Sequence, residues 1–244
     1  MSSGRYQYIR RRLQKTLEQS ALILMEHGQR GEFVPVALEA EFGAKGSTMP
    51  GYRITLEDGT SMYLQGKIDR IEHAKAGDTG YLRVIDFKSG KQGLDLTEVY
   101  YGLKIQLLTY LRVALQYYET LLPEGETLLP AGVLYYFFRS GILQADGPIN
   151  PSEAQAMHHK DVRANGLLLA DMHGLKLADR TLSTGSSNLL PLTLLSKAEQ
   201  YIDDPDSFDA LEDPMELFGK RNHTVVSKEQ LSMLLVHVEQ LIQM

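Results

Sequence analysis

A pair of strand-like segments joined by a short polar turn constrains the fold of this chain more than any other feature. Residues 61–75 and 81–88 are rich in apolar side chains, and the turn signal Gly77-Asp78-Thr79-Gly80 lies between them. This pattern predicts a β-hairpin, which we centre between Asp78 and Thr79.

The expected hairpin brings three charged side chains to one face. It pairs Lys88 with Asp69, and Asp86 shares their face because it lies two residues from Lys88. Two carboxylates on adjacent strands suit a hard divalent cation such as Mg²⁺, and a lysine beside them can stabilise developing negative charge. A cation held there can activate water for hydrolysis of a phosphodiester.

The same spacing is equally consistent with a ladder of opposite charges on a solvent-facing hairpin. The apolar neighbours Val84, Ile85 and Phe87 favour the functional interpretation, because a surface ladder is expected to have more polar neighbours.

The other segments predict an α/β fold with a mixed sheet. Strands are expected at 34–42, 52–57 and 130–138, in addition to the hairpin. Helices are expected at 5–28, 151–161, 192–202 and 227–242. Another helix begins at Asp95 with a capping-box pattern, and its expected sheet-facing side carries Leu103, Leu107, Tyr110, Leu111, Ala114 and Tyr118.

Composition limits the chemistry and the location of the chain. Its 244 residues, 43% of them hydrophobic, are enough for one large folded domain. No apolar run is long enough for a membrane span or a secretory signal, which predicts a cytoplasmic protein. Without cysteine, a metal in this chain must be held by oxygen or histidine.

Charge is distributed unevenly. Residues 113–218 carry 16 acidic and 6 basic side chains, so a nucleic-acid surface is expected in the first half of the chain. Three tyrosine pairs are consistent with stacking on single-stranded bases or, more commonly, with filling the rim of the core: Tyr100-Tyr101, Tyr117-Tyr118 and Tyr135-Tyr136.

Three motifs in sequence order resemble the PD-(D/E)XK nuclease superfamily, specifically its RecB-like branch. They are Gly66-Lys67-Ile68-Asp69-Arg70, Ile85-Asp86-Phe87-Lys88-Ser89 and Gln106-Leu107-Leu108-Thr109-Tyr110. Further stretches between residues 30 and 175, including Glu98-Val99-Tyr100-Tyr101-Gly102-Leu103, look like the nuclease domains of AddB subunits of ATP-dependent helicase/deoxyribonucleases.

The resemblance implies a restriction-endonuclease-like mixed β-sheet flanked by helices, with a metal site. Asp69, Asp86 and the backbone carbonyl of Phe87 are implied to bind Mg²⁺, with Mn²⁺ as an alternative. Lys88 is implied to act on the water and the scissile phosphate. Glu39 matches an upstream acid that assists the metal directly or through water, although an ordinary strand carboxylate is equally consistent.

Two further residues are implied to support catalysis. Gln106 and Tyr110 lie one helical turn apart, and in this branch such residues support the site and approach DNA. Some relatives also use a histidine on a helix upstream of the acids as a metal ligand. His27 is the only candidate here, it lacks a clear motif, and we expect it not to bind metal.

The chain also departs from the AddB pattern. AddB subunits carry a four-cysteine iron–sulfur cluster, which a chain without cysteine cannot hold, and a helicase-like portion before the nuclease. An excised nuclease domain and a truncated paralogue both account for these differences.

The expected function is that of a metal-dependent DNA exonuclease domain in a helicase–nuclease complex for double-strand break repair and recombination. Its expected partners are single-stranded DNA or a duplex end and a helicase–nuclease partner subunit, with no membrane. The alternative is a DNA-binding or subunit-docking module that does not cut. We expect a single nuclease domain over 1–244, with an N-terminal helix (1–32), a catalytic core (33–140) and an acidic C-terminal extension (141–244).

Overall fold

The fold is taken from a computed structural model of the chain. It describes residues 4–56, 58–90, 93–138, 163–219 and 224–243, together with positions 147, 148, 150, 153 and 157.

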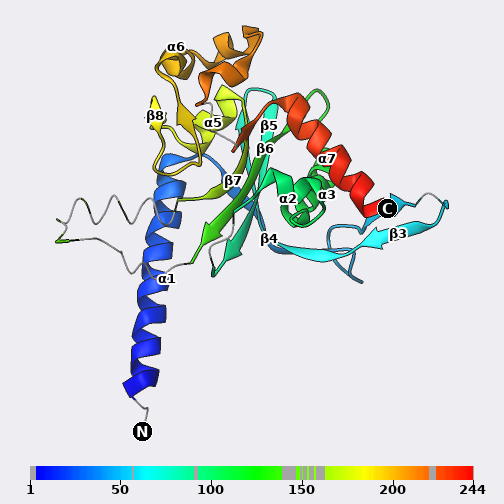
Figure 1. The fold of residues 1–244 in the computed structure, drawn as a ribbon. Coiled ribbons are helices and arrows are strands. Elements are labelled where there is room, and N and C mark those ends of the chain that lie inside the picture. Colours follow the sequence, from blue (N-terminus) through cyan, green and yellow to red (C-terminus); the bar gives the residue numbers. More distant parts are fainter. Residues whose placement is uncertain are drawn as a thin grey trace.

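A six-stranded mixed sheet forms the centre of the molecule, in the order β1-β4-β5-β6-β7-β10 (Figure 1). The β5–β6 and β7–β10 pairs are parallel and the other pairs are antiparallel. The interior strands β5 and β6 are buried over most of their length, which explains their nearly continuous apolar runs. The strands are β1 (Val34–Phe42), β4 (Gly66–Ala76), β5 (Thr79–Lys88), β6 (Thr127–Phe137), β7 (Asn165–Leu169) and β10 (Val225–Val226).

Helices cover both faces of this sheet. On one face, α3 (Gln106–Glu119) and α7 (Lys228–Gln243) pack in the same core as Val84 of β5. On the other face, α5 (Met172–Ala178) and α6 (Glu199–Asp203) share a core with Ile85. The predicted α/β architecture, a mixed sheet flanked by helices, is confirmed.

Shorter elements complete the described fold. Two small antiparallel sheets pair β2 (Tyr52–Thr55) with β3 (Ser61–Leu64) and β8 (Gly185–Ser186) with β9 (Thr193–Leu194). The 3₁₀-helices are η1 (Ser196–Ala198), η2 (Pro205–Ala210) and η3 (Pro214–Leu217). The predicted helix at 192–202 is therefore only partly helical, and the one predicted at 151–161 lies almost entirely outside the described residues.

The central hairpin forms, but two residues out of the predicted register. Ala76 pairs with Thr79, so the loop consists of Gly77 and Asp78. The φ of Gly77 is +56°, as a two-residue loop with glycine first requires. Because side chains alternate with a period of two, a shift of two residues keeps each side chain on its predicted face. Continued beyond its last pair, this register sets Asp69 beside Asp86, where Lys88 was predicted.

The helix predicted from Asp95 is two helices, α2 (Leu96–Tyr100) and α3. The Asp95 side chain accepts a hydrogen bond from the Thr97 backbone amide, which confirms the predicted start. Gly102 then adopts a φ of +76°, which ends α2 and turns the chain before α3. Leu103 consequently lies on the surface, 73% exposed, and not on the sheet-facing side of a continuous helix.

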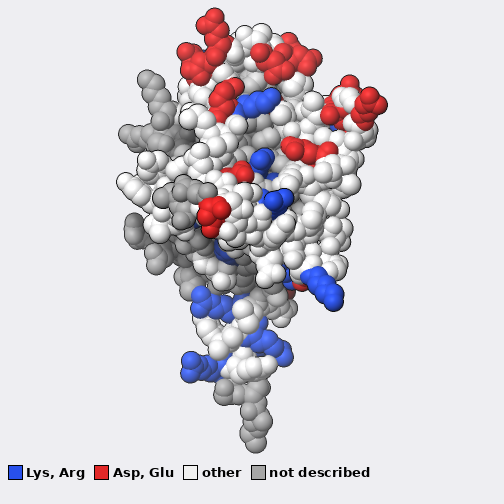
Figure 2. All heavy atoms as spheres, turned by 90° about the vertical axis from the view of Figure 1, so that its right-hand side faces the viewer, with Lys and Arg blue, Asp and Glu red and all other residues white. Residues whose placement is uncertain are grey.

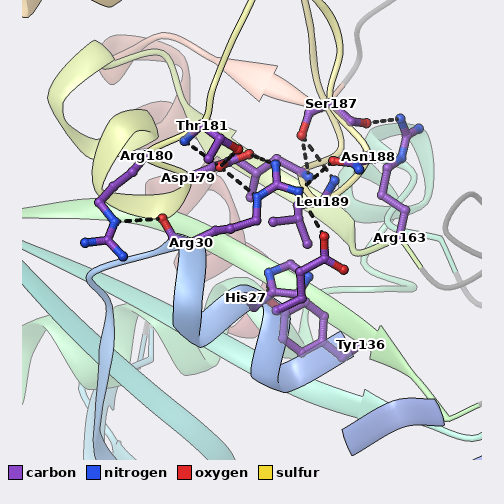
Figure 3. Close-up of polar contacts among 12 residues, drawn as sticks. His27, Arg30, Tyr136, Arg163, Asp179, Arg180, Thr181, Ser187, Asn188 and Leu189 are labelled. Carbon is purple, nitrogen blue, oxygen red and sulfur yellow. Dashed lines mark hydrogen bonds and ion pairs between the residues drawn. The ribbon is translucent and has the colours of Figure 1, made fainter. Parts of the chain in front are cut away.

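The helix α1 (Gly4–Arg30) projects from the body, and its buried side chains, Ser20 and His27, lie in its C-terminal half (Figure 1). Residues 4–15 are exposed, whereas His27 is buried. Figure 3 shows the attachment: Arg30 binds the buried Asp179 carboxylate through two nitrogens, and His27 Nδ1 lies 2.9 Å from Tyr136 Oη. The Arg180 backbone amide donates to the Arg30 carbonyl at 2.8 Å.

This attachment is expected to make stability depend on pH. Burial, and then the nearby Arg83 guanidinium, lower the pKa of His27 to about 3. The folded pKa is below that of the unfolded chain, so stability falls as pH falls from about 6.5 toward 3. Between about pH 7 and pH 5, wild-type protein should lose about 2 kcal/mol of unfolding free energy that His27→Gln does not lose. Urea unfolding at both pH values checks this, and equal losses in the two proteins would contradict it.

The charge asymmetry of the sequence is visible on the surface. Figure 2 shows acidic side chains gathered at the end of the molecule that carries α6, and basic side chains along α1. Among the described residues, no helix combines the length and the apolar character needed to cross a bilayer.

Candidate active site

The last residues of β5 place a buried carboxylate next to a lysine. Asp86 is only 4% exposed, and Lys88 Nζ lies 2.6 Å from Asp86 Oδ2 as an ion pair. Apart from this ion pair, the buried Asp86 Oδ2 has no hydrogen-bond partner within the described part of the chain. A buried acceptor left in this state is uncommon in folded proteins and indicates a site with a further purpose.

Asp69 lies beside this pair on β4. The β4–β5 ladder runs as far as Arg70 opposite Ile85. Beyond it, Asp69 Oδ2 accepts a hydrogen bond of 2.9 Å from the Phe87 backbone amide. This bond anchors the Asp69 carboxylate to the strand that carries Asp86, close enough for the charge of Asp69 to act on Asp86.

Burial and charge both act on the Asp86 carboxyl. Burial raises its pKa above the usual value, the Lys88 ammonium lowers it in part, and the charge of Asp69 raises it further. Tyr135 is the β6 neighbour of Asp86, and its ring centre is 5.7 Å from Lys88 Nζ. Burial and the Asp86 charge raise the pKa of Tyr135 to about 12, so this residue remains a neutral phenol at the site.

Glu39 does not contact the other predicted site residues in the described structure. Its side chain is exposed and forms an ion pair with Lys67. Its φ of +50° lies in the left-handed region, which costs a non-glycine residue about 1–2 kcal/mol. Across the described ranges, no three histidine or acidic side chains are grouped so that they could hold a metal ion. The structure thus brings together two acids, Asp69 and Asp86, and leaves Glu39 with Lys67.

Gln106 and Tyr110 meet on the first turns of α3. Gln106 Nε2 donates to Tyr110 Oη at 3.0 Å, and the pair is accessible to solvent. Tyr110 packs edge-on against Phe42 of β1, with ring centres 5.9 Å apart. These contacts tie the start of α3 to the sheet on the β1 side.

Tyr135 is the site residue that sequence reasoning missed. The sequence pattern marks it only as a member of an apolar strand with a second tyrosine beside it. Its place next to Asp86 depends on the parallel pairing of β5 with β6, and no local pattern specifies which strands pair. Knowledge of that pairing would have been the only signal.

A cavity of about 840 Å³ lies at the other end of β5 and contains none of the predicted site residues. It is lined by the hairpin loop and by acidic side chains of the C-terminal region, among them Asp171, Asp206 and Glu229. The cavity is therefore separate from the site at which cleavage is predicted.

The carboxylate oxygens at the candidate site are suitable ligands for a divalent cation. A buried carboxylate oxygen that has only an ion pair with Lys88 among the described residues, held near a second carboxylate, offers the oxygen ligands that Mg²⁺ and Mn²⁺ prefer. A bound cation would also offset the burial and the repulsion from Asp69 that raise the pKa of Asp86. His27 is no part of this set, since its Nδ1 faces Tyr136.

Comparison with known proteins identifies relatives that match most of this chain. The B subunit of the ATP-dependent helicase/deoxyribonuclease of Moorella thermoacetica is 42% identical over 193 residues, which cover 79% of this chain and 16% of the relative. The protein of the same name from Pelotomaculum thermopropionicum is 43% identical over 195 residues, covering 80% and 16%. That of Oceanobacillus iheyensis is 37% identical over 215 residues, covering 86% and 18%.

The chain therefore spans less than a fifth of the length of these curated relatives. A family model described as the PD-(D/E)XK nuclease superfamily matches residues 1–212, which include the whole candidate site. With the mixed sheet and the paired carboxylates in place, this match shows that the chain belongs to the PD-(D/E)XK nuclease superfamily.

Proposed function

We propose that this chain is a metal-dependent DNA exonuclease that works within a helicase–nuclease complex for repair and recombination of double-strand breaks. The observation that carries the proposal is the buried Asp86 carboxylate, which is held near the Asp69 carboxylate and whose Oδ2 has only the Lys88 ion pair among the described residues. The relatives are named as B subunits of a helicase/deoxyribonuclease, which supports DNA as the substrate and another protein chain as the partner.

In this proposal Asp69 and Asp86 hold the cation, Mg²⁺ or Mn²⁺, with the Phe87 backbone carbonyl as a third oxygen. When bound, such a cation supplies Lewis acidity and a water of lowered pKa. The Phe87 amide keeps one Asp69 oxygen in place, and burial keeps Asp86 in one position. Preorganised ligands of this kind avoid a cost of rearrangement when substrate arrives.

In this proposal Lys88 is the side chain that provides positive charge, in addition to the charge of the cation. Its ammonium is held at Asp86 and partly exposed, so a phosphate that approaches from solvent can meet it. There it would stabilise the negative charge that develops on the phosphate as the water attacks, and orient that water. The Tyr135 ring lies close to the Lys88 ammonium and limits the movement of that ammonium.

The remaining predicted residues have supporting roles in this proposal. The solvent-accessible Gln106–Tyr110 pair lies on the first turns of α3. There it presents hydrogen-bonding groups to a DNA strand. Glu39 acts through water, because it is exposed and paired with Lys67.

Replacement of Lys88 tests the proposal. Lys88→Ala should reduce the rate of DNA cleavage in Mg²⁺ by about a hundredfold to a thousandfold, the usual effect of losing one preorganised charge or donor. Metal affinity should be retained, because the variant removes a positive charge next to the ligands and leaves both carboxylates.

Cleavage of end-labelled DNA by the two proteins, with EDTA as a blank, provides the measurement. Lys176→Ala, which removes a lysine on α5 far along the chain from the site, is the matched control and should cut at the wild-type rate. Cleavage by Lys88→Ala at the wild-type rate would contradict the proposed role of this side chain.

A further inference from the structure

We propose that Tyr100, Tyr101 and Leu103 form a stacking surface that binds the unpaired bases of single-stranded DNA and guides the strand to the active site. This inference rests on the proposed nuclease function and adds to it a binding surface for a single strand. Of the three tyrosine pairs in the sequence, only Tyr100-Tyr101 is freely exposed, at 62% and 70%, whereas Tyr135 and Tyr136 are buried.

The rings of this surface are held in fixed orientations. The Tyr100 ring is stacked on the His237 ring of α7, with centres 5.1 Å apart and planes at 14°. His237 Nε2 also lies 3.1 Å from the Tyr100 carbonyl oxygen. The Tyr101 ring stands almost perpendicular to that of Tyr100, at 84° and 5.3 Å. Because the rings are already ordered, binding a base costs less side-chain entropy.

The backbone turn at Gly102 keeps these side chains on the outside. Its positive φ separates the short helix α2 from α3 and directs Leu103 to solvent, where it is 73% exposed. A continuous helix would have buried Leu103 against the sheet. The fold thus uses a break in a helix to expose three adjacent apolar side chains, an arrangement that needs a reason in a folded protein.

A chain of contacts connects this surface to the candidate active site. Tyr135, the neighbour of Asp86 and Lys88, pairs with Asn165 on β7. Asn165 Oδ1 accepts a hydrogen bond from the Leu94 backbone amide at 2.8 Å, which fixes the loop before α2.

The same loop is held from the far side of α2. Lys104 Nζ donates to the Gly93 carbonyl at 3.0 Å and pairs with Glu98 of α2 at 2.5 Å. Gly93 and Leu94 are therefore held from both sides, and in the sequence they lie between Lys88 and the tyrosines.

Exposed aromatic rings on the helix that follows the candidate active site in the sequence favour DNA bases over a protein partner. Every base offers a π-face to a tyrosine ring whatever the sequence, and stacking of this kind is independent of phosphate contacts. Bases in a duplex are stacked on each other and do not present those faces. The surface therefore favours a single strand.

Binding experiments without cleavage test this inference. Asp86→Ala protein in EDTA is titrated into a fluorescent oligothymidylate and into an abasic oligomer of the same length. Adding Tyr101→Ala or Tyr100→Ala should weaken binding to oligothymidylate by about tenfold and leave binding to the abasic oligomer unchanged. Tyr63→Ala on β3 is the matched control, since Tyr63 is also 62% exposed, and should change neither affinity.

Three results would overturn the inference: equal binding of oligothymidylate by all variants, equal losses for both oligomers, or no binding of oligothymidylate by the parent protein. Loss of binding to a protein partner without loss of DNA binding in Tyr101→Ala would also overturn it and assign the surface to that partner. Failure of the nuclease proposal is seen separately, as absence of cleavage by wild-type protein in Mg²⁺.

Discussion

Replacing Asp86 with alanine is expected to reduce metal-dependent DNA cleavage by at least about a thousandfold, because it removes a buried ligand of the proposed cation. The fold should be kept or even stabilised. Burial and the charge of Asp69 raise the pKa of Asp86, which means that the folded protein tolerates this carboxylate at a cost. Loss of activity with an unchanged or higher melting temperature is therefore the expected combination.

The control for this variant is an acid that has no place in the site. Asp58→Ala removes an exposed carboxylate in the turn between β2 and β3 and should cut DNA at the wild-type rate. Cleavage by Asp86→Ala within a few-fold of wild type would remove Asp86 from the mechanism. Loss of both cleavage and folding would contradict the expected gain or retention of stability.

Replacing Gly166 with alanine is expected to destabilise the protein by about 4 kcal/mol or more, an exceptional effect for one methyl group. Gly166 has a φ of +153°, and a Cβ there would lie 2.0 Å from the Val133 carbonyl oxygen. That oxygen belongs to the backbone of β6, which cannot move without opening its pairing with β7. Chemical denaturation followed by circular dichroism measures the loss.

Gly28→Ala is the matched control for this prediction. A Cβ at Gly28 meets nothing within 4 Å, and the residue lies inside α1, so alanine should stabilise the helix by up to about 1 kcal/mol. A Gly166→Ala protein as stable as wild type would show that β6 and β7 do not approach as closely as described.

The sequence predicted the central hairpin, but it was wrong to place all its strands in one sheet, because the segments at 52–55 and 61–64 pair with each other in a separate sheet. The hairpin was placed correctly, but its register was not, because Gly77-Asp78-Thr79-Gly80 allows more than one loop. The deciding residue is Gly77, whose positive φ suits the first position of a two-residue loop. The face that carries Asp86 was still predicted correctly, since the register error was an even number of residues.

The helical segment after β5 is a case in which the sequence prediction was wrong. Apolar spacing alone predicts one continuous helix, because Leu103 falls on the same side as Leu107 and Leu111. Gly102 is tolerated in that pattern but supplies a left-handed turn that ends α2. The exposed tyrosine surface follows from that break, which periodicity could not have revealed.

Contacts between distant segments were beyond sequence reasoning. Asp69 and Asp86 come from one hairpin and were placed on one face from local spacing, whereas Tyr135 joins them through the parallel partner β6. In the same way, the burial of His27 depends on Tyr136 of β6, and the anchoring of Arg30 depends on Asp179. Such contacts depend on tertiary packing, which no single segment encodes.

The central claim is that Asp69 and Asp86 together bind one divalent cation, and calorimetric titration of Mn²⁺ tests it without any need for activity. We predict one binding site in wild-type protein, loss of that binding in Asp69→Ala and in Asp86→Ala, and unchanged binding in Asp58→Ala. Equal Mn²⁺ binding by wild type and both site variants would contradict the claim.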